Sequence, residues 1–120
     1  MIDPMSTKTK RKTYSFKGKV WKYKGPAGWY FVTLPKNLSK TIRQKHGLSE
    51  EGWGRLKAQA SVKDSQWQTS IWFDSKAMSY LLPIKASVRK TAKIAVGSSI
   101  SVTLYLKEED TRFGLLARSR

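Results

Sequence analysis

Residues 67–90 read WQTSIWFDSKAMSYLLPIKASVRK and combine two strand patterns with a basic helical segment. From Trp67 to Asp74, residues suited to a core alternate with residues suited to solvent, which is the period-two pattern of a half-buried strand. Residues 74–79 have the composition of a turn, and the apolar run 80–84 predicts a second strand. Residues 86–94 then favour a short helix. Together these patterns predict a β-rich fold.

Four other segments predict further strands, three of them by the same alternation and residues 29–34 as the hairpin partner that follows the turn at 24–28. These segments are residues 14–23, 29–34, 55–62 and 99–106. In the first of them, a bulge at Gly18 would exchange the two faces of the strand. Six short strands separated by frequent turn signals indicate an all-β domain with two short helices. We expect a small six-stranded, mostly antiparallel barrel, because closure removes the exposed strand edges that promote aggregation.

Glycines are expected to end both helices. Asn37 or Ser39 can cap the first helix, which would stop where Gly47 adopts the left-handed backbone conformation. The second helix covers residues 86–94 and is expected to end before Gly97.

The chain has 120 residues, which is the length of a single domain. Residues 1–13 carry four basic side chains and no apolar periodicity, so they predict a disordered basic arm. The barrel domain would then cover residues 14–106, followed by a charged tail at residues 107–120. The sequence from Met5 onwards is typical of a natural start, which leaves the origin of residues 1–4 open.

The composition also narrows the cellular context. Cysteine is absent, so no disulfide, thiolate nucleophile or cysteine-type zinc site is expected. The basic N-terminal segment lacks the apolar run of a secretory signal, and no apolar stretch has the length of a membrane span. These features predict a cytoplasmic protein without membrane contact.

Positive charge dominates the composition, with 24 Lys and Arg residues against 8 Asp and Glu, a formal net charge of +16. Twelve basic residues and no acidic residue lie between Asp3 and Glu50, and six more lie between Asp74 and Glu108. A surface with one sign of charge attracts polyanions, so nucleic acid is the first expected partner. A surface that serves only solubility is the alternative.

Several sequence blocks resemble the bacterial domain-of-unknown-function family 1905. The blocks are GWYFVTLP at 28–35, GWG at 52–54, WQTSIWFD at 67–74 and YLLPIKASVRK at 80–90, followed by Gly97. The resemblance covers roughly residues 14–106. It implies a small barrel similar to the double-split β-barrels, which include DNA-binding proteins of the AbrB and MazE type, and it implies no catalytic residues.

The residues that enzymes use are scarce in this chain. His46 is the only histidine, and its place beside Gly47 at a helix end predicts a solvated side chain. Ser70 has no histidine within a recognisable motif, and the eight acidic residues form no spaced cluster for a metal. The sequence therefore predicts a protein that is not an enzyme and has no cofactor or metal.

Basic and aromatic side chains instead share the surfaces that the core leaves free. The candidate phosphate-binding residues are Lys17, Lys19, Lys85, Arg89 and Lys93, and the candidate stacking residues are Trp21, Tyr23 and Trp72. Lysines neutralise phosphates and flat rings stack on bases. The sequence predicts weakly selective nucleic-acid binding, because no long recognition helix is present.

Two alternatives stay open. The indoles of Trp21 and Trp72 would cover a second layer or a sheet edge if they are not part of a binding surface. The second alternative is a barrel that holds a small ligand or a protein segment in an aromatic-lined mouth, with the charge serving solubility or an acidic partner. The oligomeric state, monomer or homodimer, is also open.

Overall fold

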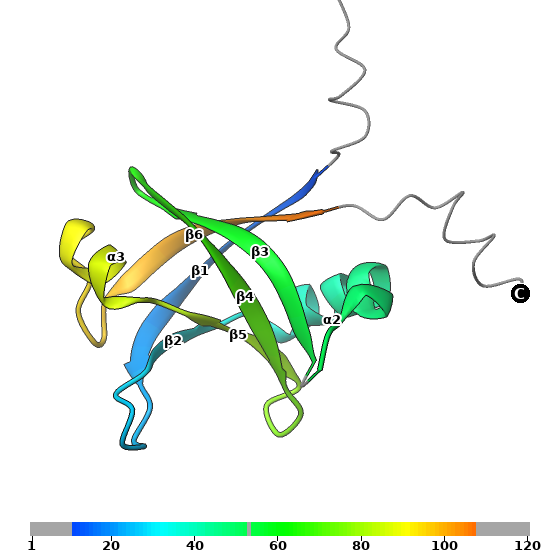
Figure 1. Cartoon of the computed structure of the whole chain (residues 1–120), viewed down its shortest axis with the longest axis horizontal. Coiled ribbons are helices and arrows are strands. Elements are labelled where there is room, and N and C mark those ends of the chain that lie inside the picture. Colours follow the sequence, from blue (N-terminus) through cyan, green and yellow to red (C-terminus); the bar gives the residue numbers. More distant parts are fainter. Residues whose placement is uncertain (1–10, 53, 108–120) are drawn as a thin grey trace, which may run out of the picture.

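The computed structural model describes residues 11–52 and 54–107, which form a closed barrel of six strands with two short helices on opposite sides (Figure 1). The strands are β1 (Arg11–Lys22), β2 (Tyr30–Thr33), β3 (Arg55–Val62), β4 (Ser65–Asp74), β5 (Ser79–Pro83) and β6 (Ser99–Lys107). The helices are α2 (Lys36–His46) and α3 (Ala86–Thr91), and the short 3₁₀ helix η1 (Gly47–Ser49) follows α2 directly. The predicted fold class is confirmed.

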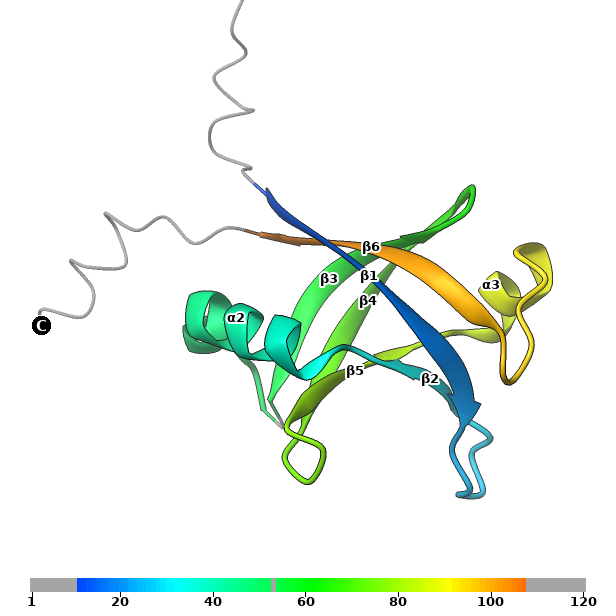
Figure 2. The same ribbon diagram turned by 180° about the vertical axis from the view of Figure 1, so that it is seen from behind.

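Around the barrel the strands follow the order β1-β2-β5-β4-β3-β6, and every neighbouring pair is antiparallel. The long strand β1 pairs with β6 from Arg11 to Lys19 and then with β2 from Val20 to Lys22. This change of partner along one strand joins the two edges of the sheet, as Figure 2 shows from behind.

The alternation seen in the sequence sets the inside and the outside of the barrel. In β1, Tyr14, Phe16 and Val20 are buried in the core, whereas Lys17 and Lys19 are exposed. No exchange of faces occurs at Gly18 in the structure. A Cβ at Gly18 would lie 2.8 Å from Cγ1 of Val32, so glycine is needed there because β2 approaches closely.

Helix α2 differs from the prediction at both ends. It begins at Lys36, with Pro35 at the N-cap position and no side-chain cap. Ser39 is buried inside the helix, where its hydroxyl accepts a hydrogen bond from the backbone N–H of Tyr80 at 3.0 Å. Gly47 keeps a right-handed conformation with φ −57°, because the chain continues into η1. The prediction of a left-handed Gly47 was wrong.

Helix α3 is shorter than predicted and ends at Thr91. Lys93 takes the left-handed conformation with φ 57°, and its N–H reaches the carbonyl of Lys90 at 3.4 Å. The N–H of Ile94 bonds to the carbonyl of Arg89 at 2.8 Å, which completes a Schellman motif. The helix therefore stops well before Gly97, which the sequence had suggested as the stop.

The first strand begins at Arg11, three residues earlier than the predicted start at Tyr14. The rest of the predicted basic arm and the tail beyond Lys107 lie outside the described residues. Within the described residues, no helix is both long enough and apolar enough to cross a membrane.

Candidate binding groove

Four aromatic side chains pack together on the outside of the barrel and form what we call the outer aromatic cluster. The ring of Phe31 in β2 lies 5.2 Å from Trp21 and 6.4 Å from Trp72, measured between centroids. The indole of Trp29 stacks on Phe31 at 6.0 Å and lies 5.6 Å from Trp72. Phe31 is buried without belonging to the barrel core, because the three indoles cover it. Trp29 remains 43% exposed.

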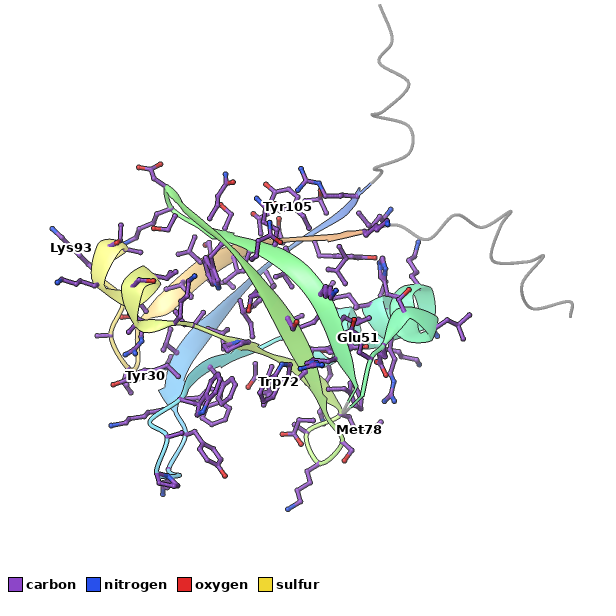
Figure 3. The ribbon with its side chains drawn as sticks, in the orientation of Figure 1. Tyr30, Glu51, Trp72, Met78, Lys93 and Tyr105 are labelled. Atoms are coloured by element: carbon purple, nitrogen blue, oxygen red, sulfur yellow. The ribbon has the colours of Figure 1, made fainter. Side chains whose placement is uncertain are left out.

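A groove of about 630 Å³ opens beside this cluster, between β4 and the segment that leads from β5 into α3. Figure 3 labels two of its lining residues, Tyr30 and Trp72. Its lining combines the indoles of Trp29 and Trp72 with four basic side chains. The basic residues are Arg55 and Lys57 of β3 and Lys85 and Arg89 of the α3 segment. Among the described residues, no Asp or Glu lines the groove. Its volume lies in the usual range for ligand sites.

The groove exists because the pairing of β4 with β5 stops early. The last pair in this direction joins Trp72 to Leu81, so two positions further on Pro83 would stand opposite Ser70. Alternate residues of a strand bond to opposite neighbours, and the N–H of Ile84 bonds to β2, so the backbone nitrogen of Pro83 faces β4. Proline has no N–H to donate. The ladder therefore ends there, and the two strands separate.

The separation leaves one edge of β4 open to the groove. The N–H of Phe73 donates to the carbonyl of Gly54, just before β3, at 3.0 Å, so odd-numbered residues of β4 bond toward β3. The backbone groups of Gln68 and Ser70 consequently point to the opposite side. Both residues line the groove.

Arg89 is held at the groove by two contacts. Its guanidinium carbon lies 3.6 Å from the ring centroid of Tyr30, and its Nε donates to the carbonyl of Ile84 at 3.2 Å. The stacked position leaves the flat side chain half-buried. Stacking and a backbone hydrogen bond lower the entropy that Arg89 would lose on binding an anion.

Glu51 partly balances the charge on the other side of the groove. Its carboxylate lies 3.5 Å from a guanidinium nitrogen of Arg55 and 3.7 Å from Nζ of Lys57. All three side chains are well exposed, with Lys57 the most exposed at 81%. Ion pairs this exposed are weak and exchange readily with other anions. The groove therefore keeps an excess of positive charge.

The family model for the domain of unknown function DUF1905 matches residues 16–104. The match runs from β1 to β6 and covers most of the barrel. The chain belongs to the DUF1905 family. No protein with curated annotation matches the chain. The groove of this DUF1905 domain lies between Ala27 and Arg89 in the sequence, entirely inside the matched region.

The predicted binding residues do not all meet in the DUF1905 barrel. Trp72, Lys85 and Arg89 line the groove, and Trp21 belongs to the outer aromatic cluster with its Nε1 donating to the hydroxyl of Thr33 at 2.9 Å. Three residues are exposed but do not line the groove, namely Lys17, Lys19 and Tyr23. Lys17 and Lys19 share the outer face of β1 with Trp21, as predicted.

Lys93 does not belong with Lys85 and Arg89. The prediction of a single basic stripe was wrong, because the helix ends at Thr91 and the left-handed backbone at Lys93 turns its side chain off the helical face. Figure 3 shows Lys93 at the outer edge of the molecule, away from Trp72.

Sequence reasoning missed several residues of the site, among them Trp29, Phe31, Arg55 and Lys57. A signal existed for each of these four. Trp29, Phe31 and Thr33 alternate with the inward residues of β2, and Arg55 and Lys57 alternate with buried Leu56 and Ala58. The missing information was the strand pairing, which sets Arg55 opposite Trp72 and Lys57 opposite Ser70.

A second, smaller hollow of about 460 Å³ lies beside α2, with Lys36, Lys40 and Arg43 in its lining. Arg43 already has two partners there. Its Nε lies 3.5 Å from Oε2 of Glu50, and its guanidinium carbon lies 3.8 Å from the centroid of the Phe73 ring. The hydroxyl of buried Tyr80 donates to Glu50. Burial raises the pKa of Tyr80, and the hydrogen bond and charge of Glu50 raise it further, against the opposite effect of Arg43. This cluster fastens α2 to the barrel.

The only histidine in the sequence, His46, is buried between α2 and the barrel and has a structural role. His46 is 3% exposed, and its Nε2 lies 2.9 Å from the hydroxyl of Tyr14. The prediction of a solvated His46 was wrong, because the buried face of α2 extends to its last residue. Within residues 11–52 and 54–107, no three His, Cys, Asp or Glu side chains gather in a way that could hold a metal ion.

Proposed function

We propose that this DUF1905 domain is a non-enzymatic module that binds nucleic acid in the groove, with little sequence preference. One observation carries the proposal: two accessible indoles, Trp29 and Trp72, share a groove with four basic side chains and, among the described residues, no carboxylate. Binding of single strands needs these two elements, a basic path for the backbone and flat rings for the bases.

The arrangement gives each element a distinct task. Arg55 and Lys57 lie on one side of the groove and Lys85 and Arg89 on the other, so a strand that crosses Trp72 can place phosphates against both pairs. Base stacking on an indole contributes about 1–3 kcal/mol per base.

Weak sequence selectivity follows from the helices. Reading the major groove of a duplex requires an exposed helix or ribbon that can enter it. Helix α3 has six residues and ends in a Schellman motif, and α2 packs its buried face on the barrel. Neither is suited to base reading in a major groove.

Fluorescence anisotropy with labelled oligonucleotides tests the proposal. Trp72→Ala should lower affinity by about tenfold, the loss of one stacked base, without changing the salt dependence. The matched control is Tyr105→Ala, which removes another outward-facing, half-buried aromatic side chain that does not line the groove. The proposal fails if no oligonucleotide binds at low salt and micromolar protein, or if both variants bind equally well.

A further inference from the structure

The open edge of β4 offers hydrogen-bonding groups that the barrel does not use. No backbone partner is present for the groove-facing N–H and C=O groups of Gln68 and Ser70 among the residues that the structure describes. The Ser70 carbonyl receives one long bond from the Thr69 hydroxyl, at 3.4 Å, which leaves it a second lone pair. The groove thus contains a donor and an acceptor side by side on one strand.

Residues from both faces of β4 line the groove. Trp67 and Thr69 point inward from β4, yet both line it together with outward-facing Gln68 and Ser70. Trp67 is only 6% exposed, and its Nε1 is a buried donor without an acceptor in the described part of the chain. Unsatisfied buried donors are rare, so Nε1 of Trp67 is expected to meet either an ordered water or a ligand acceptor.

From these features we infer that the groove receives an unpaired base, whose pairing edge bonds to the open edge of β4. The inference rests on the proposed function and deepens it, because it assigns the site to single-stranded nucleic acid. Each base has a hydrogen-bond donor beside an acceptor on its pairing edge, and in a duplex the complementary strand occupies that edge. An edge of Gln68 and Ser70 therefore accepts any unpaired base and rejects a paired one.

The remaining lining fits the same ligand. The centroids of Trp29 and Trp72 are 5.6 Å apart with their planes at 51°, so a base stacks on an outer indole face and not between the two rings. Cations flank the β4 edge on both sides, where the phosphates of an inserted nucleotide would lie.

An extended peptide is the other ligand that pairs with a strand edge. The edge that faces the groove comprises only Gln68 and Ser70, which is short for strand addition. Four surrounding cations and two indoles favour a nucleotide over a peptide backbone.

Modified oligonucleotides test the inference separately from the proposed function. A short thymidine strand is compared with its adenosine duplex and with the same strand made of N3-methylthymidine, which keeps its ring and phosphates but has lost the donor on its pairing edge. We expect the duplex to bind about tenfold more weakly and the methylated strand about three- to tenfold more weakly, the value of one hydrogen bond. Equal binding of the methylated and unmodified strands overturns the inference and leaves the proposed function standing. Failure of every strand to bind overturns both.

Ser70→Pro supplies the matching change in the protein. Proline at this position removes the groove-facing N–H and no bond of the β3–β4 ladder, and Ser70→Ala is the control that keeps the N–H. The Ser70 N–H would meet a carbonyl oxygen of the base, whereas the N3–H that methylation removes would meet a backbone carbonyl of β4. Ser70→Pro should therefore weaken binding of the thymidine strand by about three- to tenfold, whereas Ser70→Ala should leave it unchanged, with circular dichroism verifying both folds. If instead an acidic peptide competes as well as the thymidine strand and loses binding in Ser70→Pro, the site is a peptide site and the inference is wrong.

Discussion

Removal of the two β3 cations, Arg55 and Lys57, should change the salt dependence of nucleic-acid binding. Both side chains lie on the outer face of β3, 44% and 81% exposed, so Arg55→Ala with Lys57→Ala should leave the barrel intact. The double variant removes two of the four cations that line the groove.

The magnitude follows from counterion release. Each phosphate of a single strand contributes about 0.7 to the slope of log affinity against log salt, so four contacts give a slope of about −2.8 and two give about −1.4. Between about 50 and 200 mM salt, affinity should fall by about 50-fold in the wild type and by about 7-fold in the variant.

Anisotropy titrations at several salt concentrations measure both slopes. The control is Lys45→Ala with Lys76→Ala, which removes the same charge from exposed positions outside the groove. In the double variant Glu51 loses both of its ion-pair partners. Adding Glu51→Gln removes the unpaired carboxylate that this leaves beside the groove. Equal slopes of log affinity against log salt for the groove variant and the wild type would refute the assignment of phosphates to Arg55 and Lys57.

Two further outcomes are expected. Glu51→Gln alone should raise affinity at low salt by up to about fivefold in the same assay, because it frees Arg55 and Lys57; weaker binding would contradict the electrostatic account. Tyr80→Phe should lower stability by about 1–2 kcal/mol near neutral pH in urea unfolding, through loss of the bond to Glu50. Because the folded-state pKa of Tyr80 is raised, wild-type stability should decline as pH rises above 10.0, the ordinary value, and the gap to Tyr80→Phe should narrow; a constant gap from pH 8 to 11 would exclude this linkage.

The alternation in the sequence was sufficient to predict the barrel and the faces of its strands. Period-two patterning assigns each residue to the inside or the outside without knowledge of the neighbours, so the outward positions of Lys17, Lys19 and Trp72 followed directly. The groove could not be predicted in this way. It depends on the register that sets Pro83 against Ser70, and register is a property of two strands.

The helix ends show a different limit of sequence reasoning. Gly47 and Gly97 are strong stop signals, yet α2 continues into η1, and α3 ends at Thr91 with a non-glycine residue, Lys93, in the left-handed position that follows. Tertiary contacts decided both outcomes. The buried face of α2 reaches His46 and Tyr14, and Ile94 is buried in the core just after the Schellman turn.

The binding of a short single-stranded oligonucleotide, followed residue by residue by NMR, tests the central claim most directly. The account predicts that the largest shifts at saturation belong to the indole N–H signals of Trp29, Trp67 and Trp72 and to the backbone amides of Gln68 and Ser70. Shifts confined to the hollow beside α2, or spread over the lysines of β1 with these five signals unmoved, would contradict it.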